Sequence, residues 1–359
     1  MLLILISTLA VGCDAPKADY ELKNEKMSND KMKNNTITLA ITGDVMLGRL
    51  VNDYVILGNK PVTYVWGNML EHLKKADLTI INLENAIAKS GTEWYKTPKV
   101  FFYRADPKAI DVLKAAKIDY VTLANNHVLD YEEEAFIETL QHLEKNNISY
   151  AGAGRNISQA SKPAFLEANG IKIAIISFTD NMQEWAATET KPGINYIEIN
   201  KNNVKKVKES ITEAKKIADI VIVSAHWGPN MRQRPSNEFK EFAHAIIDAG
   251  ADTFHGHSAH IFQGIEIYKG RLIMYDAGDL VDDYAIDSEL RNDQTFLFLV
   301  TLSKNKIKKV ELIPGLIYLM QVNKATDADF EEIADKMVKL SEEMGTKLVK
   351  KKGKLEVVI

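Results

Sequence analysis

The histidines of this 359-residue chain are distributed unevenly, and only eight are present. Three of them fall within the stretch FHGHSAH, as His255, His257 and His260, where a short apolar run ends. Carboxylate, amide or imidazole side chains follow four other apolar runs in the same way. The candidate functional residues found by this pattern are Asp44, Glu84, Asn126, His127, His226, His257 and His260.

This mixture of side chains favours a site for transition-metal ions. Imidazole and carboxylate groups together suit zinc, iron or manganese, whereas calcium and magnesium favour oxygen ligands alone. Six candidate ligands, with His127 left aside, exceed the three or four that one zinc ion needs. Two ions about 3.5–4 Å apart, sharing one carboxylate, would use all six. The sequence therefore predicts two divalent ions, Mn, Zn or Fe.

The elements that must position these residues follow from hydrophobic periodicity. The first five predicted strands are near-continuous runs of Val, Ile and Leu, as expected for strands covered on both faces. The predicted strands span residues 36–43, 76–84, 118–125, 171–178, 218–226 and 252–256. Amphipathic segments, predicted to be helices, lie at 106–117, 131–147, 203–218 and 236–250. This alternation predicts an α/β fold with a mainly parallel sheet, whose strand ends would bring the candidate ligands to one edge.

Two details refine this prediction. Asp106 and Pro107 occupy the positions of an N-cap and a first helical residue, so a helix is expected to begin there. The strands predicted after residue 260 lie closer together along the chain, which favours an antiparallel return. We therefore expect a sheet that is parallel near the candidate ligands and antiparallel beyond them.

Composition narrows the function classes. The chain is 46% hydrophobic and 26% charged, which are ordinary values for a globular protein. Its net charge is −4 and its pI is about 6.1, so no nucleic-acid partner is expected. With a single cysteine, the chain cannot form an intramolecular disulfide, and its stability must come from the core.

The first 35 residues are predicted to be a leader and a tether. Residues 1–13 form an apolar run that is too short to span a bilayer and ends in Ala-Val-Gly-Cys, which resembles a bacterial lipobox. We expect Cys13 to be lipidated, which makes the protein an extracytoplasmic, membrane-anchored lipoprotein. Residues 14–35 are polar and charged and are expected to be a disordered tether. The predicted domain then spans 36–320, and 321–359 is a C-terminal helical appendage.

Six motifs in the same order resemble the CapA family of poly-γ-glutamate capsule-biosynthesis proteins, which is related to the calcineurin-like metallophosphoesterases. They include ITGDVMLGR, NLENAI, LANNHVLDY and HGHSAHIFQG. The resemblance covers residues 36–314 and implies a four-layer α/β/β/α sandwich of the metallophosphoesterase type, with two metal ions at the strand ends. Two positions depart from the pattern. Met46 stands where the superfamily has the histidine of Asp-x-His, and Ser258 stands where a further histidine is common.

The resemblance also implies a role for each candidate. Asp44 would bind the first metal and Glu84 would bridge the two, while Asn126 and His226 would bind the second. His127 would act as the acid beside the leaving group, and His257 and His260 would divide between the ions. The nearby carboxylates are expected to form either a solvated turn or a shell supporting the ligands, and they are Asp276, Asp279, Asp282 and Asp283.

The function expected from these features is a lipid-anchored, metal-dependent phosphoesterase linked to capsule or other cell-surface polymer metabolism. Arg104, Arg232 and Arg234 are candidates for binding an anionic substrate, either a phosphoester or poly-γ-glutamate. One alternative is a non-catalytic subunit of a capsule-synthesis or export complex that binds the polyanion. Another is hydrolysis of the polymer's amide bonds. An acid at His127 favours an enzyme over a binding subunit.

Overall fold

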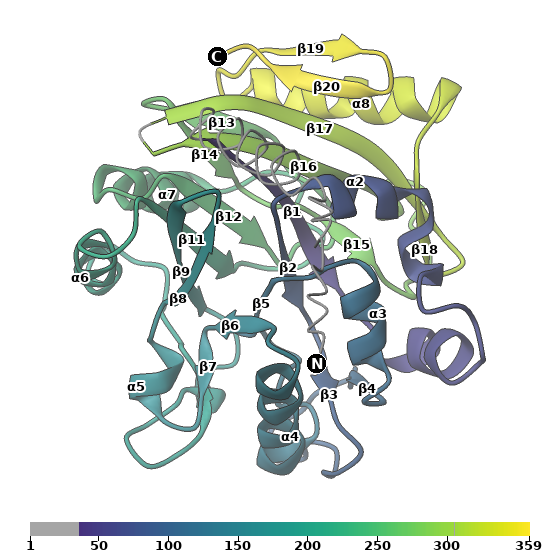
Figure 1. Ribbon diagram of the computed structural model, residues 1–359, viewed down its shortest axis with the longest axis vertical. Helices are drawn as coiled ribbons and strands as arrows, with labels where there is room; N and C mark the ends of the chain where they lie inside the picture. The colour runs from purple at the N-terminus through teal and green to yellow at the C-terminus, as the bar shows by residue number, and fades with distance from the viewer. Residues whose placement is uncertain (1–35, 305) are drawn as a thin grey trace, which may run out of the picture. The chain divides into compact units, whose positions relative to one another are not determined.

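Two mixed β-sheets form the centre of the protein (Figure 1). The structure is a computed structural model and describes residues 36–304 and 306–359, so Cys13 and the predicted leader and tether lie outside the described residues. Residues Thr36–Ile359 form one compact unit. Within this part of the chain, no helix is both long and apolar enough to cross a membrane.

The larger sheet has ten strands in the order β19-β20-β17-β16-β1-β2-β5-β6, with β15 beside β1 and β18 beside β17. Its strands β1, β2, β5 and β6 are parallel, while β16 and β17 run antiparallel to their neighbours, as predicted for the segment after residue 260. The strand bounds are β1 (Thr36–Val45), β2 (Leu78–Leu83), β5 (Tyr120–Thr122), β6 (Ser149–Ala151), β15 (Asp279–Val281), β16 (Gln294–Ser303), β17 (Lys306–Tyr318), β18 (Gln321–Lys324), β19 (Leu348–Lys351) and β20 (Lys354–Val357).

The smaller sheet has six strands in the order β13-β14-β12-β11-β9-β8. Its four central strands are parallel, and an antiparallel strand closes each edge. The bounds are β8 (Ala164–Ala168), β9 (Ile171–Thr179), β11 (Ile220–His226), β12 (Thr253–His257), β13 (Ile265–Tyr268) and β14 (Arg271–Met274). The apolar runs of the sequence thus form strands as predicted, but they divide between two sheets.

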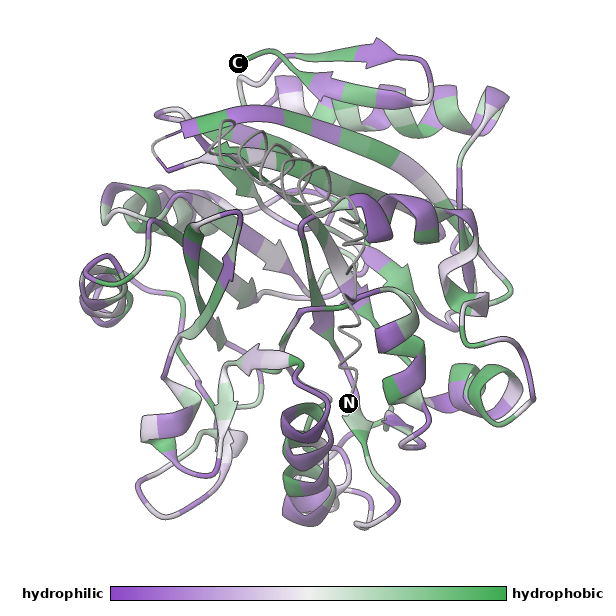
Figure 2. Ribbon diagram, in the orientation of Figure 1, coloured by the Kyte–Doolittle hydropathy of each residue, from purple (hydrophilic) through white to green (hydrophobic). Residues whose placement is uncertain are grey.

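The two sheets pack face to face and helices cover their outer faces. Ile37 and Ile41 of the larger sheet share one buried cluster with Ile173 and Ile222 of the smaller sheet. Hydrophobic residues are concentrated along these strands in Figure 2. The outer face of the larger sheet is covered by α2 (Leu70–Lys75), α3 (Ala109–Ala115) and α4 (Glu132–Lys145), and that of the smaller sheet by α6 (Val204–Ala214) and α7 (Asn237–Asp248). This is the predicted four-layer α/β/β/α sandwich.

Shorter elements complete the fold. Helix α8 (Asp327–Glu342) packs its apolar face, including Ile333 and Met337, into the cluster between the sheets. Two small two-stranded sheets pair β3 (Ala86–Ile87) with β4 (Arg104–Ala105) and β7 (Ala153–Gly154) with β10 (Gly193–Ile194). The remaining helical turns are η1 (Val51–Ile56), η2 (Tyr64–Met69), α5 (Ile157–Ala160) and η3 (Gln183–Trp185).

Two local features differ from or sharpen the sequence prediction. Helix α3 begins at Ala109 rather than at Pro107, because Asp106 Oδ1 accepts from Lys108 N and forms a turn before the helix. At Gly43, near the end of β1, a Cβ atom would lie 1.7 Å from the carbonyl oxygen of Gly278. Only glycine permits this approach, which brings the segment after β14 against the end of β1. The close contact places Asp44 next to the 276–283 carboxylates.

Candidate metal centre

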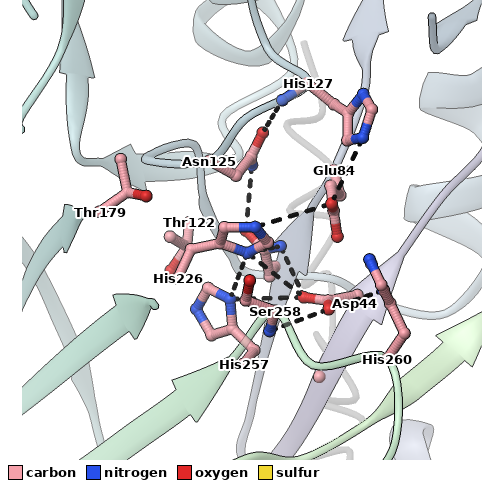
Figure 3. A network of polar contacts seen from close by, with 12 residues as sticks. Asp44, Glu84, Thr122, Asn125, His127, Thr179, His226, His257, Ser258 and His260 are labelled. Atoms are coloured by element: carbon pink, nitrogen blue, oxygen red, sulfur yellow. Dashed lines mark hydrogen bonds and ion pairs between the residues drawn. The ribbon is translucent and has the colours of Figure 1, made fainter. Parts of the chain in front are cut away.

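The candidate ligands come from both sheets. Asp44 is the last residue but one of β1 and Glu84 directly follows β2, while His226 and His257 end the paired strands β11 and β12. His260 follows three residues after β12. The prediction that all the ligands lie at the edge of one sheet was therefore wrong. Strands β1 and β2 belong to the larger sheet, whereas β11 and β12 belong to the smaller one. The carboxyl ends of the two sheets face one another instead, and five of the six predicted ligands meet there (Figure 3).

These five residues form two groups whose possible ligand atoms lie within 4.8 Å of one another. The imidazole-rich group is Asp44, His226 and His257, and the carboxylate-rich group is Asp44, Glu84 and His260. Asp44 belongs to both, with its Oδ1 3.3 Å from His257 Nδ1 and its Oδ2 3.4 Å from His260 Nδ1. Glu84 Oε1 lies 3.7 Å from His226 Nε2. The carboxylate common to the two groups is thus Asp44, where the family resemblance implied Glu84.

The donor set fits divalent cations. All five side chains are buried, yet both carboxylate oxygens of Glu84 and the Nε2 atom of His226 have no hydrogen-bond partner. A buried carboxylate without donors is costly unless a cation is present. Imidazole and carboxylate ligands in one small space suit zinc, manganese or iron. Met46, at the position of the superfamily histidine, is buried and offers a thioether in place of an imidazole.

The carboxyl groups differ in their electrostatics. Burial would raise the pKa of Asp44, but its contact with His257 and the charges of His226 and His260 hold that pKa well below its usual range. Burial raises the pKa of Glu84 well above its usual range, and the charge of Asp44 raises it further. Asp44 is therefore stabilised as an anion by the imidazoles around it. The charge of Lys99 lowers the pKa of Glu84, but burial and the charge of Asp44 outweigh it, so a bound cation would stabilise the ionised form of Glu84.

His127 lies beside the carboxylate-rich group with a fixed orientation. Its Nδ1 atom is 2.6 Å from Asp130 Oδ2, and its Nε2 atom is 3.8 Å from Glu84 Oε1. Asp130 is itself held by the backbone N–H of Tyr103 and lies 3.2 Å from the ammonium of Lys99. Burial lowers the pKa of His127, although the charge of Asp130 opposes this shift. Sequence reasoning missed Asp130, which stands three residues after His127 in the NNHVLD motif.

Asparagines link the groups. Asn82 Nδ2 donates to Asp44 Oδ1 at 2.7 Å and lies 3.3 Å from His226 Nδ1. Asn125 in turn donates to Asn82 Oδ1, and its own Oδ1 accepts from the backbone N–H of His127. Neither residue was predicted, although Asn82 occupies the register position on β2 that pairs with Asp44. The predicted ligand Asn126 has a buried Oδ1 without a partner and lines a cavity of about 400 Å³ together with His127.

The acidic stretch after β14 supports the ligands. Asp279 Oδ1 lies 2.9 Å from His260 Nδ1, and Asp276 accepts from the backbone N–H groups of Ala259 and Gly278. The side chains of Asp276, Asp279, Asp282 and Asp283 are all buried. Of the two alternatives, a solvated turn is excluded by this burial. Asp276 and Asp279 thus contact the His-Ser-Ala-His segment. A carboxylate bound to one ring nitrogen of a histidine fixes the direction of the ring.

Two of the three predicted arginines are held by other parts of the protein. Arg104 donates to the carbonyl oxygens of Ser90 and Gly91 and stacks over a tyrosine ring, so it supports a loop. Arg234 forms a bidentate pair with Glu343. Arg232 follows directly on Met231, which lines the 400 Å³ cavity, but its guanidinium lies 5.1 Å from the ring of Phe239. Arg104 and Arg234 are thus held by groups of the protein, whereas Arg232 Nη1 is buried without a hydrogen-bond partner and its binding of an anion stays a prediction.

Comparison with known proteins places this geometry in a family. The family model described as "Bacterial capsule synthesis protein PGA_cap" matches residues 38–284. The chain belongs to this family. It is 29% identical over 368 residues to a probable polyglutamine synthesis accessory protein of Mycobacterium tuberculosis, covering 90% of this chain and 96% of the relative. The resemblance inferred from the motifs is therefore confirmed.

Two further relatives carry related names. The capsule biosynthesis protein CapA of Bacillus anthracis is 30% identical over 254 residues, which is 70% of this chain and 61% of the relative. The PGA biosynthesis protein CapA of Bacillus subtilis is 29% identical over 294 residues, covering 81% and 73% of the two chains. In this family member, the matched region contains Asp44, Glu84, His127, His226 and the whole His-Ser-Ala-His segment.

Proposed function

We propose that this family member is a metal-dependent phosphoesterase that acts outside the cytoplasm in the metabolism of poly-γ-glutamate or another cell-surface polymer. The observation that carries the proposal is the buried Glu84 carboxylate. Its oxygens have no protein donor, yet they lie beside Asp44, His226 and His260 and 3.8 Å from His127 Nε2. Such an arrangement combines a place for cations with an oriented imidazole.

The residues divide the chemistry between them. Asp44, His226 and His257 would hold one divalent ion, and Asp44, Glu84 and His260 would hold the second. Such ions lower the pKa of water and stabilise the negative charge on the phosphoryl oxygens in the transition state. His127 would donate its proton from Nε2 to the departing ester oxygen, while Asp130 holds Nδ1 and fixes the direction of the ring. Asn126 would contact the phosphoryl group or an ion through its unpartnered Oδ1.

The alternative of a non-catalytic polyanion-binding subunit is less well supported by the described residues. A polyanion requires several free cationic side chains, but Lys99 is the only lysine or arginine lining the cavity beside His127. Its ammonium is already held by Asp130 and by the carbonyl oxygen of Asn126. The oriented His127 in turn serves a purpose in catalysis that simple binding does not need. These contacts favour the enzyme.

A pair of histidine variants tests the proposal. His127→Ala should lower kcat for a dialkyl phosphodiester, whose alkoxide leaving group needs a proton, by about 10²–10⁴-fold while the metal content stays unchanged, since a general acid contributes that factor. His142→Ala is the matched control, because this histidine also pairs with a carboxylate, Glu138, but on the outer helix α4. Parent protein that turns over γ-glutamyl amides and no phosphoester would contradict the proposed reaction. If the parent protein hydrolyses neither kind of substrate, the non-catalytic polyanion-binding subunit becomes the better explanation.

The membrane anchor is a separate part of the proposal and rests on the sequence of residues 1–13. Cys13 follows Ala-Val-Gly at the end of an apolar run, as in a bacterial lipobox. A Cys13→Ser variant of the full chain, expressed in a bacterium that processes lipoproteins, should move from the membrane fraction to the soluble fraction. Equal distribution of the variant and the parent would remove the anchor from the proposal without affecting the metal centre.

A further inference from the structure

Two neighbouring cavities open beside the metal centre. The first, of about 400 Å³, is lined by His127 and Asn126 and by the side chains of Val100 and Phe101. The second, of about 250 Å³, is lined by Leu50, Ile286, Tyr318 and Leu319. Tyr284 lines both cavities, and its hydroxyl lies 3.5 Å from His260 Nε2. Tyr284 therefore borders both cavities and lies next to the carboxylate-rich group.

The rim of these cavities is apolar and exposed. Val100 is 80% exposed and Phe101 is 51% exposed, on the loop between β3 and β4. In the second cavity, four large apolar side chains are also exposed, whereas Ile317 is buried; the exposed ones are Leu50, Ile286, Tyr318 and Leu319. The guanidinium of Arg49 lies 5.1 Å from the ring of Phe101, next to Leu50, and so joins the two rims. Exposed large apolar side chains gathered around one opening mark a binding surface.

The charges lining the cavities limit what can bind there. Among the described residues lining them, Lys99 is the only lysine or arginine, and its ammonium is paired with Asp130. The second cavity is lined instead by the carboxylates of Asp282, Asp283 and Asp293. Arg49 on the rim is paired with Asp283, and Asp293 is paired with Arg291, so this surface offers a chain of negative charges no free cation. The surface fits a ligand with one anionic group at the metal centre and an apolar remainder.

We infer that the substrate is an amphiphilic phosphoester, and this inference rests on the proposed function. Its phosphoryl group would lie at the metal centre, beside His127 and Asn126. Its apolar part would pack against Val100 and Phe101 and extend past Tyr284 over Leu50 and Leu319. Burial of apolar surface on this rim would then supply affinity, while the polar centre supplies the chemistry.

Two phosphodiesters with the same leaving group test this inference. We would measure kcat/KM of the metal-loaded full chain for p-nitrophenyl methyl phosphate and for p-nitrophenyl dodecyl phosphate, the latter kept below its micelle concentration. The parent should prefer the dodecyl ester by about tenfold or more, mainly through KM, because the alkyl chain buries apolar area on the rim. The double variant Val100→Ser/Phe101→Ser should lose most of that preference, measured as the ratio of the two kcat/KM values.

The chain offers a matched control on the same loop. Tyr95 is 77% exposed but lines neither cavity, so Tyr95→Ser should keep the preference of the parent. Equal turnover of the two esters by the parent would overturn the inference. It would also be overturned if Val100→Ser/Phe101→Ser changed binding to phospholipid vesicles and left the preference intact, because the rim would then face a membrane.

A binding measurement separates this inference from the proposed reaction. Dodecylphosphonate and methylphosphonate carry the same anionic group and cannot be hydrolysed at an ester bond. Calorimetry should show about tenfold or tighter binding of dodecylphosphonate by the parent and a reduced difference for Val100→Ser/Phe101→Ser. If no phosphoester is hydrolysed but this difference is found, the proposed reaction fails while the apolar subsite stands. If hydrolysis is found without it, the subsite fails alone.

Discussion

The imidazole-rich group and the carboxylate-rich group share Asp44 but differ in how the protein supports them. In the first group, His257 Nε2 lies 3.1 Å from Ser224 Oγ, and Asn82 bridges Asp44 and His226. In the second group, neither oxygen of Glu84 has a hydrogen-bond partner. His260 of the second group is held by Asp279, so Glu84 is the one carboxylate of the two groups that depends on a cation for its stability. The comparison indicates that the two ions are held with unequal strength.

Loss of the shared carboxylate should have the largest effect. Asp44→Asn keeps the size of the side chain but removes a ligand from both groups, so we expect affinity for both ions to fall by more than about 100-fold. Removal of a residue that only orients a ligand already costs about 10–100-fold. Elemental analysis of dialysed protein measures the loss, with circular dichroism as the check on folding. Retention of one ion per chain would show that the groups do not share Asp44.

Glu84→Gln should separate the two groups. The substitution removes the charge of the carboxylate-rich group and leaves Asp44, His226 and His257 in place, so the metal content should fall from two ions per chain to one. His257→Ala provides the opposite comparison, because it removes an imidazole from the other group. The same titration by elemental analysis measures both variants. Loss of both ions from Glu84→Gln would mean that Glu84 bridges them, as the family resemblance implied.

Asp130→Asn should have a smaller effect, confined to His127. Asp130 raises the pKa of His127 against the effect of burial, so its neutral replacement should lower that pKa further. A general acid must be protonated, and the alkaline limb of kcat should therefore move to lower pH. We expect kcat to fall by about 10–100-fold, as for other residues that orient a functional histidine, with the metal content unchanged. An unshifted pH profile would show that Asp130 has only a structural role.

Most residues of the candidate metal centre could be predicted from the sequence, because polar residues that follow apolar runs can be recognised without a structure. Asp44, Glu84, His226, His257 and His260 were identified in this way and lie together. The assignment to one edge failed because pairing between strands is a long-range property. Nothing in the local sequence shows that β1 pairs with β2 and β16 while β11 pairs with β9 and β12.

Residues that act through others were harder to find. Asn82 lies inside the buried strand β2, so it was read as part of an apolar run. Asp130 stands just before α4, and acidic residues are common at that position of a helix. Their roles depend on the register of β2 against β1 and on the path of the loop that carries His127. Arg104 and Arg234 show the converse. A guanidinium near a motif indicates anion binding only if no carbonyl or carboxylate of the protein already holds it.

Anomalous diffraction from crystals grown with Mn²⁺ or Zn²⁺ tests the central claim most directly. We expect two anomalous difference peaks. One should lie among Asp44, His226 and His257, and the other among Asp44, Glu84 and His260, with ligand distances of about 2.0–2.3 Å. Absence of any peak at these residues in protein that binds the ion elsewhere would contradict the account.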